Sequence, residues 1–509
     1  VPIENRWEAS DPVTVAELLE HTAGFDDFSL AEFYDFDAPP EKPLLWPLQH
    51  FPGPQRARWH PGRRTSYSNP GYGVAGYVIE KAAATPIEQF IAENITRPLG
   101  MAYSDLRLTP EVKAALAQGY DHVPEPTPYY PIYLRTAGEM KSSPAEMARF
   151  VRMMLGRGAL EGTRIVSAES IARMETPETS LAARAGLKYG YGLGNYADLS
   201  KAIVTHGHDG GIDGFLSRYA YIPEDCVGYF FSINSTSDGG FRAIDKLLFN
   251  YLTHDFQKPK ESAAPLGVDA AHLAGYYEPA APRQEKLAFV GLLTGGLNVG
   301  LHRGALYIKP IFGARTKLVP VGPELFRTER QSAASTIFAV DGAGNQVVVT
   351  AFSPLTPLPF YFVRTDPDWP MIRLVLVIGA IILMLTSVVF APIWIARKLL
   401  GRMRTVTHLA VRVVPLLAVV AFAASYSPLA YASALELARP DWLTMTLFIG
   451  SCLFALLSVA GLILSVRSFR WPINRAARIH SILVSCACVG LTWYLAYWGF
   501  IGLRLWVPW

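Results

Sequence analysis

The sequence predicts an α+β domain built on an antiparallel sheet with a helical subdomain, then a small all-β domain, and then four transmembrane helices. Three observations support this order. Helical patterns give way at Tyr189 to short aromatic and β-branched runs, and alternating strands with glycine turns fill residues 266–366. The remaining part holds four apolar runs, each long enough to cross a membrane, at about 371–396, 411–435, 443–466 and 479–503. The predicted domains are 1–258, 259–368 and 369–509.

The composition indicates a membrane protein and argues against nucleic-acid binding. Charged residues make up 17% of the 509 residues, whereas soluble proteins have roughly 25%, and 50% of the residues are hydrophobic. The formal net charge of +3 is too small to attract nucleic acid, and residues 1–370 contain no Lys/Arg-rich block with interleaved aromatic residues. We therefore expect a lipid bilayer as a partner and no nucleic acid.

The cysteines predict neither a disulfide framework nor a metal site. Cys226 is the only cysteine before the apolar runs, and Cys452, Cys486 and Cys488 lie within them. Cys486 and Cys488 are two positions apart, so they would not share a face of a helix.

Capping boxes mark three helix starts in the first domain, at Thr14–Glu17, Thr85–Glu88 and Ser143–Glu146. The third box opens a helix that runs to about Gly156. Its apolar face is predicted to consist of Met147, Phe150, Val151, Met154 and Leu155. Residues 26–58 lack a clear period and predict an irregular region near a substrate cleft.

Four strands and a covering helix are predicted after Tyr189. The strands are Tyr189–Gly194, Ala202–His206, Phe215–Ile222 and Val227–Asn234. An amphipathic helix over Phe241–Thr253 follows them. The residues predicted to face the sheet are Ile244, Leu247, Leu248 and Tyr251.

A short loop presents Tyr67, Ser68 and Asn69 before a helix predicted over Gly73–Ala84. The turn dipeptides Pro61-Gly62 and Pro70-Gly71 flank the loop and hold its side chains in place. Taken alone, the triplet has a simpler interpretation, in which Tyr67 lies at the edge of the core and Asn69 only forms a turn. Its surroundings favour a function, because the helices and a closing Pro98-Leu99-Gly100-Met101 complete one long ordered pattern.

This pattern resembles the serine β-lactamase, penicillin-binding-protein and esterase family, of the class C type. The segment Val13–Gly24 is similar to a second family segment, Thr-Val-x-x-Leu-Leu-x-His-Thr-Ser-Gly, with Ala23 in place of the serine and a structural His21. The resemblance implies a serine hydrolase that acts through an acyl-enzyme on a peptide, amide or ester and needs no cofactor. It also implies that Tyr67 helps to move the proton of the nucleophile and that Asn69 hydrogen-bonds the acyl side chain. Residues 266–366 resemble the lipocalin-like domain often appended to this family.

The glycine-rich stretch Thr205–Phe215, predicted between the second and third strands, matches the third motif of the family, Lys-Thr-Gly or His-x-Gly. The simpler alternative is a glycine-rich hairpin with a surface histidine. By the resemblance, His208 orients the substrate or supports proton transfer, Asp209 and Gly210 bind substrate, and the Gly211 N–H stabilises the oxyanion.

His206 competes with His208 for this role, although the spacing from Gly210 to Phe215 favours His208. A histidine in this position titrates near neutral pH, so recognition of a carboxylate is expected to weaken as the pH rises. This histidine and Asp209 depart from the usual Lys-Thr pair, which makes a peptide or ester at least as plausible a substrate as a penicillin.

The Ser-x-x-Lys pair that supplies the nucleophile in this family is missing, because no lysine has a serine three residues before it. In the family the pair precedes the segment that holds His21, so we expect it upstream of Val1, in a part truncated from this chain. Two hypotheses remain. The protein is a membrane-anchored serine hydrolase whose nucleophile lies outside this fragment, or a non-catalytic membrane-bound binding or sensor protein with a degenerate cleft. A transporter is disfavoured, since the apolar runs hold almost no ionisable residues apart from Arg373 and Arg412 near their ends.

Arginine asymmetry predicts the orientation in the membrane. The basic residues that follow the first apolar run, or separate the third from the fourth, are Arg397, Lys398, Arg402, Arg404, Arg467, Arg470, Arg475 and Arg478. The positive-inside rule makes both connections cytoplasmic. Residues 1–370 are then on the extracytoplasmic side of the cell (inner) membrane, where cell-wall substrates lie.

Overall fold

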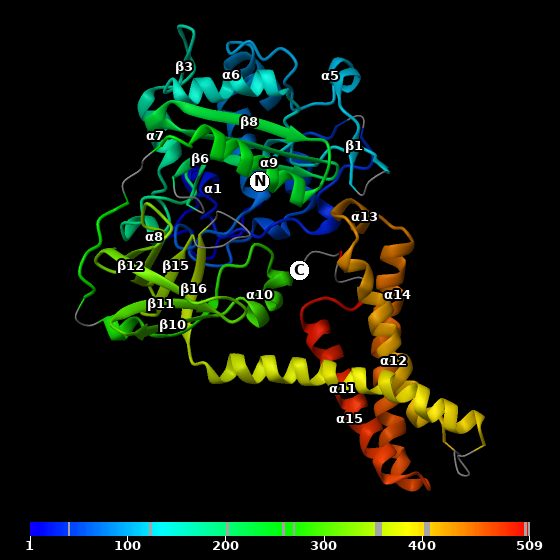
Figure 1. Cartoon of the computed structure of the whole chain (residues 1–509). Coiled ribbons are helices and arrows are strands. Elements are labelled where there is room, and N and C mark those ends of the chain that lie inside the picture. Colours follow the sequence, from blue (N-terminus) through cyan, green and yellow to red (C-terminus); the bar gives the residue numbers. More distant parts are fainter. Residues whose placement is uncertain are drawn as a thin grey trace. The chain divides into compact units, whose positions relative to one another are not determined.

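The structure, a computed structural model, describes residues 1–38, 41–121, 125–199, 203–256, 260–267, 270–351, 359–401, 408–502 and 506. The chain divides into two compact units. The first unit comprises Val1–Phe28 and Glu32–Thr365, and it contains an antiparallel sheet with its helices and a β-barrel (Figure 1). The second unit comprises Ser29–Ala31 and Asp366–Trp509.

The sheet of the first unit has four antiparallel strands in sequence order: β5 (Tyr196–Asp198), β6 (Thr205–Ile212), β7 (Phe215–Ile222) and β8 (Val227–Ile233). A two-residue turn joins β6 to β7, and Gly214 takes the positive φ of 87° that this turn requires. β5 pairs only with Thr205–Gly207. Within the described residues, the outer edge of β6 from His208 onward therefore has no strand partner.

Two of the strand predictions need correction. Tyr189–Gly194 forms only an isolated bridge, between Tyr191 and Tyr196. The chain here passes close to Met174, since a Cβ on Gly192 would lie 2.1 Å from the Met174 carbonyl oxygen. The glycine-rich stretch is strand β6 itself, not a loop between strands. A Cβ on Gly207 would lie 2.1 Å from the carbonyl oxygen of Tyr219, so glycine allows β6 and β7 to approach. Ala202, where this strand was predicted to begin, lies outside the described residues.

Helix α6 (Pro144–Leu155) covers one face of the sheet. The Ser143 side chain caps it as predicted, by accepting a hydrogen bond from the Glu146 N–H. Its buried residues Val151 and Met154 pack in one cluster with Tyr221 of β7, and the other predicted apolar positions surround that cluster. The predicted apolar face is therefore confirmed.

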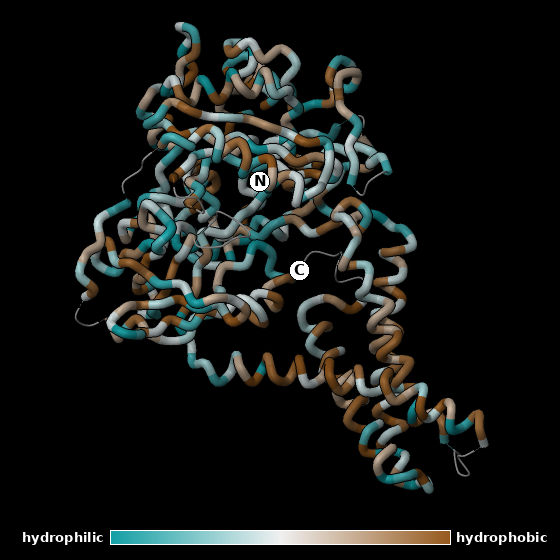
Figure 2. The backbone as a smooth tube through the Cα atoms, in the orientation of Figure 1, coloured by the Kyte–Doolittle hydropathy of each residue, from teal (hydrophilic) through white to brown (hydrophobic). Residues whose placement is uncertain are grey.

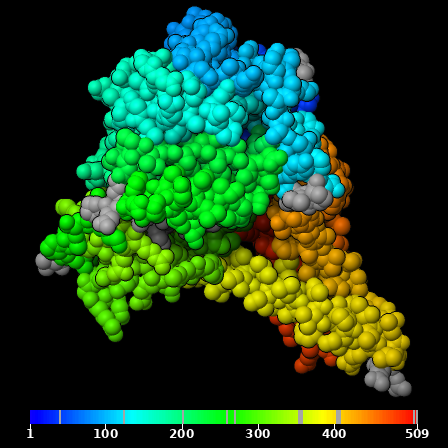
Figure 3. Space-filling model, turned by 45° about the horizontal axis from the view of Figure 1, so that its top comes forward, coloured from blue at the N-terminus to red at the C-terminus, as the bar shows by residue number. Residues whose placement is uncertain are grey.

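Helix α9 (Asp238–Leu252) covers the opposite face, and its inward side differs from the prediction. Leu247 and Tyr251 are 69% and 75% exposed, whereas Asp245 and Phe249 are buried. The Asp245 carboxylate accepts a hydrogen bond from the Tyr229 hydroxyl (2.5 Å), and this contact sets the rotation of the helix. The green band that includes α9 lies at the molecular surface in Figure 3.

The other helices of the first unit are short or medium in length. Of the three predicted capping boxes only that of Thr14 is complete, because the Glu146 carboxylate accepts from the Tyr103 N–H (2.9 Å) instead of closing the box at Ser143. Thr14 makes its box, but at Thr85 the Ile87 N–H instead donates to the Glu80 carboxylate (3.1 Å). The helices are α1 (Val15–Leu19), α2 (Leu45–His50), α3 (Asn69–Ala83), α4 (Ile87–Ile91), α5 (Pro110–Ala115), α7 (Ala168–Glu175), α8 (Leu181–Arg184) and α10 (Ala288–Thr294). Two small hairpins pair β1 (Gly119–Tyr120) with β2 (Pro126–Thr127), and β3 (Ala159–Leu160) with β4 (Thr163–Arg164).

The predicted small all-β domain is a closed antiparallel barrel of eight strands. The strands are β9 (Gly275–Pro279), β10 (Leu297–His302), β11 (Ala305–Pro310), β12 (Thr316–Gly322), β13 (Leu325–Thr328), β14 (Thr336–Val340), β15 (Gln346–Thr350) and β16 (Phe360–Thr365). One cluster around Tyr277, Phe326 and Phe338 forms the core of the barrel. Ile337 and Val349 belong to a second cluster, shared with residues next to α8, which joins the barrel to the sheet domain.

Among its described residues, the second unit contains four helices that are long and apolar enough to span a membrane, as predicted. They are α11 (Asp368–Leu399), α12 (Ala410–Tyr426), α14 (Trp442–Arg467) and α15 (Arg475–Tyr497), and they are largely brown in the hydropathy view of Figure 2. α12 ends before the predicted 435, since a 3₁₀ turn containing Pro428 follows it and leads into the short helix α13 (Ala434–Ala438).

Candidate active site

Tyr67 lies immediately before α3, in a loop that the segment around His21 holds in place. The Ser68 side chain caps α3 and donates to the Asp26 carbonyl oxygen (2.8 Å). The Ser68 N–H donates to His21 Nδ1 (3.1 Å), and the Ser66 N–H donates to the His21 carbonyl oxygen (2.8 Å). The loop is therefore fixed by backbone contacts on both sides of Tyr67.

The Tyr67 ring lies among other rings, with its hydroxyl available to a ligand. The ring centres of His21 and His208 are 4.0 Å and 6.4 Å from that of Tyr67. Burial raises the pKa of Tyr67 to about 12, so the hydroxyl keeps its proton at neutral pH. In the part of the chain that the structure describes, this hydroxyl has no hydrogen-bond partner.

His208 is held as one neutral tautomer. Its Nδ1 contacts the Asp209 carbonyl oxygen, which has no proton to donate, so Nδ1 carries the hydrogen. Its Nε2 then accepts a hydrogen bond from the buried Tyr191 hydroxyl (2.8 Å). Burial lowers the pKa of His208. The lowered pKa favours the uncharged ring at neutral pH, which argues against the carboxylate recognition by a charged His208 that the sequence predicted.

We expect His208 to remain neutral at pH 6.5, where a solvent-exposed histidine is about half protonated. The cause is burial, which lowers the pKa of the ring and opposes protonation until the pH falls further. Nitrogen NMR of the protein labelled at histidine, with His208→Gln to assign the signal, measures this directly. A ring that is half charged at pH 6.5 would contradict the expectation. Tyr191→Phe should raise the pKa, because the neutral ring loses its donor.

The other predicted site residues lie on two sides of β6. Asn69 is buried at the start of α3, and its side-chain amide donates to Asp27 Oδ2 (3.3 Å). Gly210 and Gly211 lie on the stretch of β6 with the open edge and are exposed. The Asp209 side chain points to the α9 side, where its carboxylate is 3.3 Å from Arg218 Nη1. The structure thus places His208 beside Tyr67, pairs Asn69 with Asp27, and directs Asp209 to Arg218.

His206 lies two positions before His208 on the same face of β6, and it is buried against Tyr221, with 5.9 Å between ring centres. Burial lowers the pKa of His206 as well. The ring contacts of Tyr67 in the described residues include His208 and not His206.

Sequence reasoning missed three residues of this site: Tyr191, Asp27 and Arg283. Arg283 comes from the connection between β9 and β10 of the barrel, and its guanidinium carbon lies 4.5 Å from the centre of the Tyr67 ring. Its Nε donates to Asp27 Oδ2 (2.6 Å), which also contacts Asn69. No local signal could reveal this contact, since Arg283 and Asp27 are 256 residues apart in the sequence.

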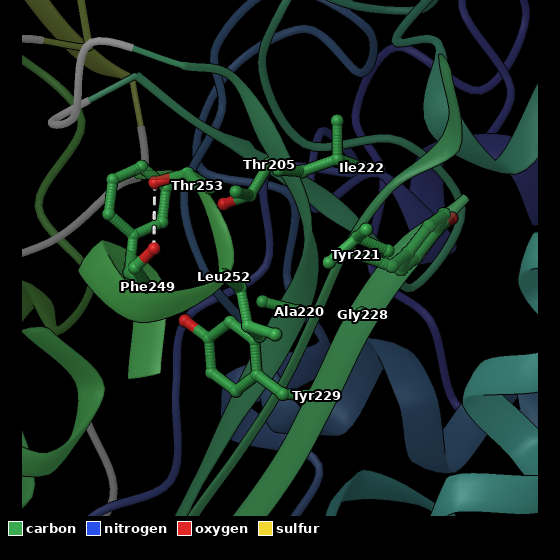
Figure 4. A pocket seen from close by; sticks show the side chains of 10 residues that line it. Thr205, Ala220, Tyr221, Ile222, Gly228, Tyr229, Phe249, Leu252 and Thr253 are labelled. Carbon is green, nitrogen blue, oxygen red and sulfur yellow. Dashed lines mark hydrogen bonds between the residues drawn. The ribbon is translucent and has the colours of Figure 1, made fainter. Parts of the chain in front are cut away.

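A small cavity lies on the other side of the sheet, between β6, β7, β8 and α9 (Figure 4). Thr205, Tyr229 and Phe249 are among its lining residues, and its volume is about 10 Å³. This is the space of about one water molecule, so the cavity cannot hold a substrate.

The Beta-lactamase family model matches residues 1–262 of the chain, which is just over half of its 509 residues. Among curated proteins, an unguisins hydrolase from Aspergillus campestris is 27% identical over 238 residues, which is 43% of this chain and 42% of that protein. A beta-lactamase from Lysobacter lactamgenus is 25% identical over 205 residues, covering 35% of this chain and 53% of the relative. Among solved structures, the octameric penicillin-binding protein homologue from Pyrococcus abyssi covers 72% of this chain and 83% of its own, with 19% identity and a TM-score of 0.37.

The fold and the matched region define a hydrolase class, and the chain belongs to the Beta-lactamase family. The resemblance read from the sequence is thereby confirmed, as are the fold class and the four helices that could cross a membrane. The chain spans 38% to 53% of the lengths of the curated relatives that it matches.

Proposed function

We propose that the protein is a membrane-anchored serine hydrolase that acts through an acyl-enzyme on a peptide, amide or ester outside the cytoplasm. The observation that carries this proposal is the meeting of a protonated, unpartnered Tyr67 hydroxyl with neutral His208 beside an open strand edge. An unpaired edge can bind an extended substrate through its main chain, in the way that a further strand would pair.

The serines that flank Tyr67 are poor candidates for the nucleophile. The Ser66 hydroxyl donates to the Pro282 carbonyl oxygen (2.9 Å), and the Ser68 hydroxyl donates to that of Asp26 (2.8 Å). Both are therefore committed to the backbone. We assign the nucleophile to a Ser-x-x-Lys pair that these 509 residues do not contain, in keeping with the family.

In this proposal, the serine oxygen attacks the substrate carbonyl carbon, and Tyr67 relays the serine proton to the leaving group. His208 orients the substrate or supports that transfer, and Asn69 and Gly210 bind the substrate. The N–H groups of Gly211 and of the serine hold the negative oxygen of the tetrahedral intermediate. Water then hydrolyses the acyl-enzyme. The committed side chain of Asp209 limits its part in substrate binding to its backbone.

The test is covalent labelling of the full-length gene product in membranes with a fluorophosphonate, together with hydrolysis of a chromogenic ester. We expect label on the serine of a Ser-x-x-Lys peptide, identified by mass spectrometry, and loss of label when that serine is replaced by alanine. An unlabelled protein that hydrolyses no ester would instead favour the alternative, a non-catalytic membrane-bound binding or sensor protein. The lack of a nucleophile in these 509 residues is the observation that keeps this alternative open.

We also propose that residues 1–370 face outside and that the two arginine-rich connections, 397–410 and 467–478, face the cytoplasm of the cell. Cys226 is exposed and reports on the first unit, and Phe469→Cys places a reporter at an exposed position in the second connection. In intact cells, an impermeant maleimide should react with Cys226. The Phe469→Cys reporter, in a Cys226→Ser background, should react only after permeabilisation. Reaction of this reporter in intact cells would overturn the orientation.

A further inference from the structure

Arg283 is the only arginine or lysine whose side chain contacts the Tyr67 ring in the described part of the chain, and it belongs to the barrel domain rather than to the sheet domain. It lies between β9 and the 3₁₀ turn Glu285–Leu287, so this connection brings a residue of the barrel domain to the candidate active site. Both domains lie in the first compact unit. The side chain is 57% exposed, whereas that of its partner Asp27 is 3% exposed.

The connection is fixed on both sides of Arg283. Before it, the Ser66 hydroxyl donates to the Pro282 carbonyl oxygen (2.9 Å). After it, the Gln284 side chain donates to the Phe28 carbonyl oxygen (2.7 Å). The Arg283 carbonyl oxygen itself accepts from the Asp27 N–H (3.2 Å). The backbone of Arg283 is therefore held beside Tyr67 by these hydrogen bonds. Its position does not depend on the contact between its side chain and Asp27.

The hydrogen bonds of Asp27 leave most of the guanidinium group unused. Asp27 Oδ1 accepts from the N–H groups of Phe28 (2.9 Å) and Asn69 (3.1 Å). Asp27 Oδ2 accepts from the Asn69 amide (3.3 Å) and from Arg283 Nε (2.6 Å). The carboxylate is thus satisfied by four donors. Of the Arg283 nitrogens, only Nε has a hydrogen-bond partner among the described residues, and the two terminal nitrogens remain available next to Tyr67.

We propose that Arg283 is a specificity-determining residue that binds a carboxylate on the acyl part of the substrate. A guanidinium group presents two parallel N–H donors that match the two oxygens of a carboxylate. The acyl side is favoured because Arg283 shares Asp27 Oδ2 with Asn69, the residue assigned to the acyl side chain. Burial favours the neutral form of His208, and Arg283 is the cationic side chain that contacts Tyr67. The catalytic test of this inference rests on the proposed hydrolase function, whereas the binding test does not.

The binding test uses the full-length protein and two fluorescent ligands that differ only in charge, dansyl-labelled succinamic acid and its neutral succinamide. Fluorescence titration should show at least about 10-fold tighter binding of the acid, because a hydrogen bond to a charged group typically contributes ~1.5–3 kcal/mol. Arg283→Ala should remove this preference. Arg283→Gln keeps an N–H donor for Asp27 but loses the charge, and it should remove the preference too.

The matched control is Arg56→Ala. Arg56 pairs with Glu285 (3.3 Å) on the same connection between the domains, but the structure gives it no contact with Tyr67. This variant should retain the preference for the acid. Thermal unfolding of each variant identifies any that fails to fold, in which case Arg283→Gln replaces Arg283→Ala.

The catalytic test compares p-nitrophenyl hydrogen succinate with p-nitrophenyl methyl succinate. The ratio of their kcat/KM values should fall by about 10- to 100-fold in Arg283→Ala and stay unchanged in Arg56→Ala. Hydrolysis of neither ester, with the binding preference intact, would reject the proposed function and leave the role of Arg283 standing. Equal binding of the two dansyl ligands by the unchanged protein would overturn the role of Arg283.

Discussion

Replacing Tyr67 with phenylalanine is expected to lower kcat/KM of the full-length protein by about 10²- to 10⁴-fold, the usual cost of losing a positioned acid–base group. The Tyr67 hydroxyl is the one polar atom that the substitution removes. The loop around it is held by His21 through backbone contacts that the substitution leaves in place. Hydrolysis of a chromogenic ester measures the loss. The kcat/KM of His208→Ala should be lowered by a similar factor.

Tyr103→Phe is the matched control, because the Tyr103 side chain is 65% exposed and α6 fixes the residue through its backbone N–H. It should keep full activity. Asn69→Ala should mainly raise KM, since Asn69 is assigned to binding. Full activity of Tyr67→Phe would show that Tyr67 is not the proton relay, whatever the fate of the other variants.

Replacing Arg218 with methionine is expected to lower the free energy of unfolding by about 3–5 kcal/mol, because the substitution leaves buried carboxylates without their cation. Arg218 contacts two of them, Asp198 (2.6 Å) and Asp245 (3.2 Å), and it also contacts the partly exposed Asp209 (3.3 Å). The three acids come from β5, β6 and α9, so a single side chain joins the sheet to its covering helix. Denaturant unfolding followed by tyrosine and tryptophan fluorescence measures the change.

Arg242→Ala tests whether burial, rather than charge alone, sets the size of this effect. Arg242 is exposed on α9, 4.0 Å from Asp238, and such surface pairs contribute ~0–1 kcal/mol. Adding Asp198→Asn to Arg218→Met should recover part of the lost stability, since one uncompensated charge is then removed. A loss below about 1 kcal/mol for Arg218→Met would contradict the assigned role.

The elements that the sequence predicted well are those with a strong local signal. The run Phe215–Ile222 alternates and contains aromatic residues, and it is strand β7 with the same bounds. Ser143 precedes Pro144, and its side chain caps α6 as predicted. The glycine turns and alternating runs of residues 266–366 likewise specify the barrel. In each case, the information lies within a few residues.

The errors arise where contacts with residues distant in the sequence determine the structure. For α9 the helical period was right, but the inward side was rotated, because Tyr229 and Arg218 make it favourable to bury Asp245. The motifs predicted Tyr67, Asn69 and His208, and the structure places His208 beside Tyr67. Tyr191 and Arg283 were not predicted, since nothing near them in the sequence refers to His208 or Asp27.

The alternation of β6 makes its length matter more than its composition. His208 and Asp209 are consecutive, and they lie at the candidate active site on one face and in an ion cluster on the other. Insertion of one residue between Gly207 and His208 would move the His208 imidazole to the face of Arg218, and deletion of Gly207 would move the Asp209 carboxylate to the face of Tyr67. Such a change in length is expected to lower both the catalytic activity and the folding stability. Relatives of this protein are therefore expected to carry length changes before Thr205 or beyond the turn at Gly214 rather than within β6.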